Sequence, residues 1–465
     1  MSSILYTRLA IQIVLNGLPI IAFQWSTMII PEVLEKSFGI TDKTRVSFYA
    51  SLFYVSYFCG IFLSCFIWPF VVQKVSKRRC ILFSTLMYGI MTMISGWGSD
   101  INFMLTCRFI TGLFLNVNSI GKDLLFEFAK GDIRQIGLSF DSAIALTMNL
   151  AGPFFGMLIY HQTGCDLQLT LIYIGSIFIV VGAIFVIFFF LIPYREKHRN
   201  SFSLEEAKRR EEENFEKEEN LSIMENKKGK MRLRTRSTRE VIYYCVQHKS
   251  LRNPILIYGI SLAVTNCDLL LTVVFLETSW ADNGLGISAT SLSLLCALSV
   301  IPACILLLVS PSFCPSKIDY STFMRFFIVS FGVGVMFTPL LRDLIPEKNH
   351  ESFRYLVYLV VLLKNCSNGR LYAPFIHFHL NSKSNRYIRT LINTINFVIA
   401  TLFTIILVNT VVPLLSIMLF DPRFTQYAPY NKYPLFLILV VLQGVCVFLV
   451  QEKQNGQVLE SVTEI

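Results

Sequence analysis

The sequence predicts an all-α polytopic membrane protein with twelve transmembrane helices in two six-helix bundles. Of its 465 residues, 54% are hydrophobic and only 15% are charged. A soluble domain carries about 25% charged residues. The mean hydropathy is +0.56, and the charges are concentrated, because residues 194–253 hold 27 of the 72 charged residues. This composition excludes an ordinary globular enzyme and indicates a membrane protein interrupted by one polar segment.

The helices are predicted from apolar stretches long enough to cross a bilayer, which takes roughly 20 residues. The first six are expected at 9–31, 46–68, 80–97, 103–124, 136–160 and 168–193. The second six are expected at 254–277, 289–310, 322–341, 353–378, 390–415 and 434–450. The chain then divides into an N-terminal bundle (1–193), a charged linker (194–253), a C-terminal bundle (254–450) and a tail (451–465).

Basic residues orient these helices. Arg195 and Arg199 flank the linker on one side, and Lys249 and Arg252 flank it on the other. Lys and Arg beside membrane spans are retained in the cytosol, so we expect the linker and both termini to be cytosolic. The organelle stays open between the plasma membrane and a vacuolar or other internal membrane, because no retrieval or transit signal can be read.

The linker carries two local signals. Ser203-Leu-Glu-Glu206 is a capping box that predicts a short helix. The polybasic stretch at 227–239 lies next to a membrane span and is expected to contact anionic lipids. The alternative for this stretch is a regulatory site at Ser237, which Arg234 precedes.

Signatures of catalysis are missing from the sequence. No Walker loop, G-x-S-x-G elbow, H-E-x-x-H motif or catalytic carboxylate pair can be read. The 12 Cys show no metal-binding spacing. The net charge of +10 comes from basic residues beside apolar stretches, which indicates topology and not nucleic-acid binding. We therefore expect no enzyme activity, no cofactor, no metal and no nucleic-acid partner.

A polar stripe follows the fourth predicted span. A charge at bilayer depth costs about 3 kcal/mol or more and usually faces a cavity or a partner. From Arg108, helical steps reach Gly112 and Asn116, so these residues share one face of the helix. We expect this face to line an aqueous path. The alternative is that Arg108 extends to the nearby membrane surface.

Ordered motifs resemble those of the major facilitator superfamily. Between spans two and three, Trp68-Pro-Phe-Val-Val-Gln73-Lys74-Val-Ser76-Lys77-Arg78-Arg79 resembles that superfamily's W-G-x-x-A-D-R-x-G-R-[RK] loop. Span four opens with Arg108-Phe-Ile-Thr-Gly112, similar to R-x-x-x-G, and ends at Glu127, where relatives often carry Glu. Gly152-Pro153-Phe-Phe-Gly156 resembles the G-P-x-x-G motif of the drug:proton antiporter branch. The layout looks most like zinc-induced-facilitator-like transporters.

The resemblance assigns roles to these motifs. It implies that the loop residues meet Glu127 and gate the bundle, and that the glycines and proline act in conformational change. The gating set is Gln73, Lys74, Lys77, Arg78 and Glu127, and the conformational set is Gly112, Gly152, Pro153 and Gly156. Gln73 replaces an Asp that in relatives helps to lock the outward-facing state, and an amide cannot form that ion pair.

In the resembled fold, spans one, four, seven and ten line a central cavity. Asp268 lies near the middle of span seven and Lys364 near the middle of span ten. We hypothesise that they pair across the cavity and that a solute or a proton competes for the pair. The alternative is a permanent structural salt bridge. The candidate cavity set is Gln12, Asn16, Arg108, Asn116, Asp268, Lys364, Asn365 and Asn368.

The sequence thus predicts a secondary active transporter that moves a small solute by rocker-switch alternating access, and the resemblance adds antiport with protons. An excess of positive charge at the expected cavity positions favours an anionic or zwitterionic solute. The alternative function is a transport-inactive relative that acts as a receptor or as an accessory subunit with partners in a membrane assembly. The altered loop at Gln73 and Ser76 motivates that alternative.

Overall fold

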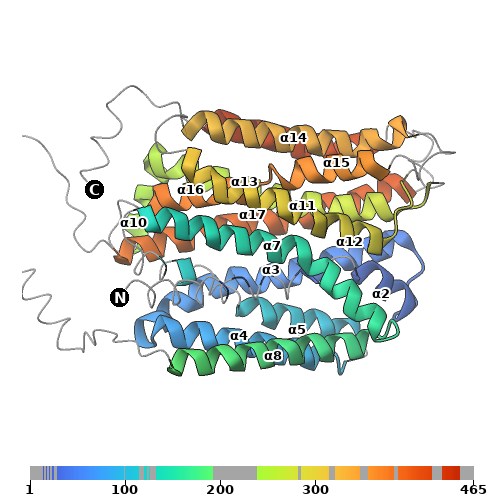
Figure 1. The fold of residues 1–465 in the computed structure, drawn as a ribbon, viewed down its shortest axis with the longest axis horizontal. Helices are drawn as coiled ribbons and strands as arrows, with labels where there is room; N and C mark the ends of the chain where they lie inside the picture. The colour runs from blue at the N-terminus through green and yellow to red at the C-terminus, as the bar shows by residue number, and fades with distance from the viewer. Residues whose placement is uncertain are drawn as a thin grey trace, which may run out of the picture.

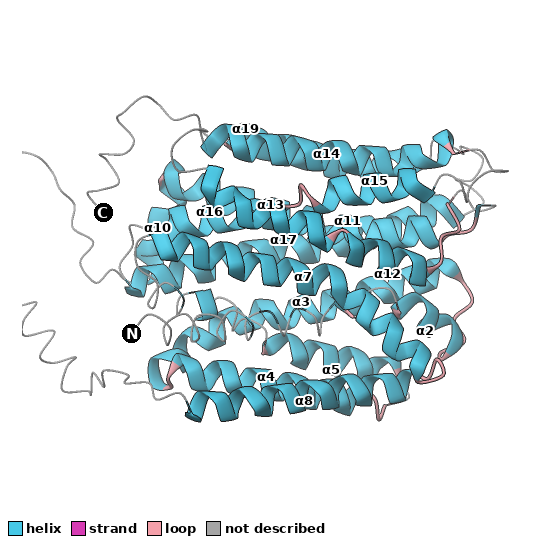
Figure 2. Cartoon of the chain, viewed as in Figure 1, coloured by secondary structure: helices cyan, strands magenta, loops and turns pink. Residues whose placement is uncertain are grey.

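The computed structural model describes most of the chain and leaves several segments undescribed. The described residues are 14, 17, 20, 24–25, 29–98, 100–114, 120–122, 125, 132–191, 238–280, 284–313, 320–345, 354–381, 386–420 and 432–450. Within them every long element is an α-helix and no strand occurs (Figure 2). Seven of the described helices are long and apolar enough to cross a membrane, and three shorter apolar helices accompany them. The predicted all-α polytopic fold is confirmed.

The N-terminal half contributes a short helix, α2 (Ile30–Lys36), which follows the first predicted span, and five helices that overlap predicted spans two to six. The five are α3 (Lys43–Lys74), α4 (Lys77–Ser95), α5 (Ile101–Leu113), α7 (Asp132–Gln162) and α8 (Leu167–Leu191). Asp42 caps the start of α3, because its carboxylate accepts a 3.0 Å hydrogen bond from the Thr44 backbone N–H. This contact satisfies one of the backbone donors that have no partner within the helix.

The C-terminal half contributes the remaining helices. They are α10 (Thr238–Gln247), α11 (Lys249–Glu277), α12 (Ala289–Leu298), α13 (Val300–Phe313), α14 (Tyr320–Leu344), α15 (Arg354–Asn365), α16 (Gly369–Asn381), α17 (Arg386–Phe420) and α19 (Tyr433–Leu449). The seventh span begins at Lys249, inside the segment predicted as linker. Two spans predicted as single helices are divided: the eighth into α12 and α13, and the tenth into α15 and α16.

The helices run side by side along one direction (Figure 1). Helices α4, α5 and α8 lie on one side of the molecule, and α14, α15 and α16 lie on the other. Across the boundary between the halves, α3 packs on α17, and α7 packs on α12, α13 and α16. We call the end that holds α10 and the α3–α4 turn the linker end, and the end that holds α2 the far end.

The loop predicted between spans two and three is mostly helical, which corrects its expected extent. Helix α3 continues through Pro69 to Lys74, and α4 starts at Lys77 with Ser76 as its cap. Only Val75 and Ser76 separate the two helices. The motif therefore consists of a helix end, a tight turn and a helix start.

Several sequence motifs act in helix packing within the N-terminal half. A Cβ on Gly112 would lie 2.1 Å from the Tyr57 carbonyl oxygen, so α5 and α3 touch backbone to backbone there. The Trp68 indole donates a hydrogen bond of 2.7 Å to the Leu113 carbonyl in the last turn of α5. A Cβ on Gly156 would likewise lie 2.3 Å from the Trp25 carbonyl oxygen. Small residues in these motifs thus set how closely the helices pack.

We expect Gly112→Ala to lower the thermal stability of the purified protein, because the methyl group meets backbone that cannot move aside. Overpacking of this kind costs about 1–3 kcal/mol. The matched control is Gly444→Ala in α19, where a Cβ meets nothing within 4 Å. The control is expected to keep or slightly raise the melting temperature, since Ala favours helix over Gly. Equal melting temperatures for the two variants would contradict the close crossing.

Candidate functional site

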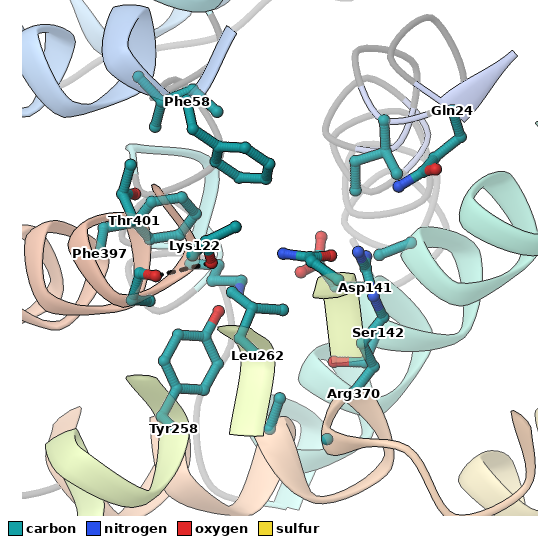
Figure 3. A pocket seen from close by; sticks show the side chains of 18 of the residues that line it. Gln24, Phe58, Lys122, Asp141, Ser142, Tyr258, Leu262, Arg370, Phe397 and Thr401 are labelled. Atoms are coloured by element: carbon teal, nitrogen blue, oxygen red, sulfur yellow. Dashed lines mark hydrogen bonds between the residues drawn. The ribbon is translucent and has the colours of Figure 1, made fainter. Parts of the chain in front are cut away.

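A cavity of about 110 Å³ lies between the two halves of the molecule. Its walls come from the first span, α3, α7, α11, α16 and α17. The polar lining groups include Gln24, Lys122, Asp141, Ser142, Tyr258, Asn266, Arg370 and Thr401. In the close-up, Lys122 and Tyr258 lie on one side of the cavity and Asp141 and Arg370 on the other (Figure 3). We call this space the central cavity.

Lys122 joins the two halves at the central cavity. Its Nζ lies 2.9 Å from Nε2 of His377 on α16, and a lysine ammonium can only donate, so the imidazole nitrogen accepts. The Tyr258 ring packs edge-on to the His377 ring with centroids 4.9 Å apart. Lys122 Nζ also lies 6.0 Å from the centre of the Tyr258 ring. The N-terminal half thus places a cation against two aromatic groups of the C-terminal half.

Arg370 lies in the first turn of α16, where the break in span ten positions it. Helix α15 ends at Asn365 and α16 starts at Gly369. The Asn368 side-chain oxygen caps the new helix by accepting a 2.9 Å hydrogen bond from the Arg370 backbone N–H. Asn365 donates a 2.5 Å hydrogen bond to the Ser299 hydroxyl, at the break between α12 and α13. The two divided spans therefore meet at their breaks, an arrangement that places helix ends inside the bundle.

Asp268 and Lys364 come together as an ion pair of 2.7 Å. Lys364 Nζ also donates to the Thr272 hydroxyl at 2.5 Å and to the Thr338 hydroxyl at 3.2 Å. Both charged residues are buried, with exposures of 3% and 5%. Three hydrogen-bonding partners around one ammonium compensate for the water that it has lost.

The pair lies in a pocket of about 30 Å³ beside the central cavity and does not line the central cavity itself. Asn365 and Asn368 line this smaller pocket, and Asn266 lines both spaces. Because α11 and α15 both belong to the C-terminal half, the ion pair does not bridge the two halves.

Arg108 lies elsewhere. It lines a separate cavity of about 20 Å³ with Trp25, Phe53 and Met104. Its guanidinium carbon is 5.3 Å from the Trp25 ring centre, and only 9% of the residue is exposed. Arg108 is thus buried against an aromatic ring and does not extend to the protein surface.

Several predicted positions fall outside the described residues. Gln12, Asn16, Asn116 and Glu127 are among them, as is the linker up to residue 237, which includes the predicted helix and most of the polybasic stretch. The backbone of Gln73 and Arg78 is described, but their side chains are not. Lys74 and Lys77 stand on either side of the α3–α4 turn.

Sequence reasoning missed Lys122 and Asp141 as cavity residues. Both are charged residues inside predicted spans, so intramembrane charge alone was a usable signal for them. The break in span ten also had a signal, because Asn365-Cys-Ser-Asn-Gly369 is rich in residues that favour turns.

Comparisons with known proteins agree with this architecture. The crystal structure of the human organic anion transporter MFSD10 (TETRAN) matches with a TM-score of 0.63, covering 95% of this chain and 98% of that chain. The two sequences are 11% identical, so the match shows a shared fold. A search of curated protein sequences found no match. The family model of the Major Facilitator Superfamily matches residues 18–400, and the chain therefore belongs to this superfamily of membrane transporters.

Proposed function

We propose that the protein is a secondary active transporter that moves a small solute by rocker-switch alternating access, in antiport with protons. The observation that supports this most is the central cavity, which lies between the halves and takes charged residues from both. Sites near the middle of the membrane at the interface of two repeats are typical of secondary transporters. In this proposal the linker end is the cytosolic end, because Lys249 and Arg252, which flank the linker, lie there at the start of α11.

Polar contacts between the halves occur towards both ends of the bundle. At the far end, His161 Nε2 lies 3.2 Å from the Thr290 hydroxyl, which links α7 to α12. On the linker side, Lys122 meets His377. A neutral hydrogen bond contributes about 0.5–1.5 kcal/mol and one from a charged donor such as Lys122 about 1.5–3 kcal/mol, so these polar contacts can break at modest cost. Opening one end while the other stays closed would give the central cavity alternating access.

The ion pair of Asp268 and Lys364 supports proton coupling. A proton on Asp268 would remove the charge that holds Lys364, and the released ammonium would need a new partner. Asn266 lines both the pocket of this pair and the central cavity. A rearrangement of the ion pair that moves Asn266 would therefore change the wall of the central cavity. A permanent structural salt bridge is the competing interpretation of the same geometry.

The transport experiment is a counterflow screen in proteoliposomes with and without a pH gradient. We expect gradient-driven uptake in the wild type and its loss in Asp268→Asn. The matched control is Asp343→Asn, because Asp343 pairs with Lys432 at 2.6 Å at the far end of the same half. The control is expected to keep gradient-driven uptake. If the wild type transports none of the tested anions, amino acids, drugs or metal chelates, the result would favour the accessory-subunit alternative.

A double variant separates coupling from structure. Removing one partner of a buried ion pair costs about 3–5 kcal/mol, because the other charge is left uncompensated. We therefore expect Asp268→Asn or Lys364→Met alone to lower the melting temperature, and Asp268→Asn with Lys364→Met to recover much of it. Under the coupling proposal the double variant still lacks gradient-driven uptake. Recovery of both stability and pH-dependent uptake would show that the pair is only structural.

A further inference from the structure

We propose that the central cavity binds a small organic anion with a single negative charge and an apolar body. The charged group would lie between Lys122 and Arg370, one from each half of the molecule. This inference rests on the transport function proposed above and names the class of solute.

The charge balance of the cavity favours one negative charge. Its charged lining groups among the described residues are Lys122, Arg370 and Asp141, which leaves one positive charge in excess. Asp268 and Lys364 compensate each other in the neighbouring pocket. An uncompensated charge at membrane depth costs about 3 kcal/mol or more. A monoanion would remove that cost, whereas a second negative charge would face Asp141 without a cation of its own.

The Arg370 guanidinium has a buried N–H group that can donate to a bound anion. Its Nε is buried and finds no hydrogen-bond partner among the described residues, and buried polar groups are normally satisfied. The guanidinium presents a planar set of donors that matches a carboxylate. Arg370 also lies at the start of a 13-residue helix, where the partial positive charge of the helix end favours an anion.

Lys122 completes the site from the N-terminal half. An ammonium has three donors, and the contact with His377 Nε2 uses one of them. Because its known partner is a neutral acceptor, an anion in the cavity would compete well for the same cation. Bound between Lys122 and Arg370, the anion would attract the two halves to each other and favour the state in which both face it.

The rest of the lining argues for an apolar body on this anion. Phe58, Leu262 and Phe397 form much of the wall, and Ile20, Ala373 and Ala400 add to it. Pockets of this kind bind an apolar surface and orient it with a few polar groups. A fully hydrated inorganic anion would gain nothing from such walls.

The test is equilibrium binding of radiolabelled benzoate to the full-length protein in nanodiscs. We expect Lys122→Gln and Arg370→Gln each to weaken binding about tenfold or more, since each removes a charge-assisted hydrogen bond. Lys122→Arg keeps the charge and is expected to keep binding. Benzamide, which has the same shape without the charge, is expected not to compete. The control is Arg45→Gln, which removes an exposed cation paired with Asp42 at 3.6 Å and should leave binding unchanged.

The outcomes separate this inference from the transport proposal. Absence of benzoate binding, equal competition by benzamide, or unchanged binding in Lys122→Gln and Arg370→Gln would each overturn the anion site. Benzoate binding without counterflow of benzoate would keep the site and contradict transport. Counterflow of an amine or a neutral solute, insensitive to both glutamine variants, would keep transport and overturn the anion. Size-exclusion profiles of the variants show whether each has folded.

Discussion

Charges buried in an apolar bundle must be compensated by other groups of the protein, and this constraint organises the molecule. Lipid offers no hydrogen bonds, so each buried ion needs a counter-charge, a hydroxyl or an aromatic face. The C-terminal half meets this need for Lys364 with Asp268 and two threonines. The N-terminal half packs Arg108 against Trp25. The central cavity differs, because Arg370 has a buried donor without a partner among the described residues.

The divided helices explain how this difference arises. A continuous helix uses its backbone groups internally, whereas a break exposes a helix start inside the protein. In span ten the break falls between Lys364 and Arg370, so the two cations lie on separate helices. Lys364 joins the ion pair within the C-terminal half, and Arg370 turns to the space between the halves. Asn365 and Ser299 hold this break against the break in span eight.

The fold was predictable from the sequence because apolar length and charge placement decide it. The resemblance at 68–79, 108–112 and 152–156 also led to the correct superfamily. The helix ends were less predictable. The stretch from Trp68 to Lys74 looked like a loop, yet Pro69 is accommodated within α3 and the turn needs only two residues. Hydropathy responds to the apolar length of a segment and is insensitive to where capping and packing end a helix.

The sequence predicted which charged residues of the site pair, but not where the pair lies relative to the cavity. Asp268 and Lys364 were expected to pair, and they form an ion pair. Two opposite charges at similar depth in an apolar bundle each lower the cost of burying the other. That they meet within one half, beside the cavity, depends on helix rotation, which a single sequence does not specify. For Lys122, the charge inside a predicted span indicated a polar position, but the partner of that charge could not be predicted. Lys122 lies next to Asp123 in the sequence, and only the packing of α16 against the N-terminal half shows that its partner is His377.

The position of the ion pair has a consequence for mechanism. A pair that bridged the halves would act as a lock, and its rupture would separate them directly. The pair of Asp268 and Lys364 lies in one half, so it can influence the other half only by changing the shape or charge of the shared space. Asn266 is the described residue that borders both spaces. In the proposed antiport, coupling between proton and solute would pass through the wall of the cavity, and the contacts that part during opening would include those of Lys122 and His161.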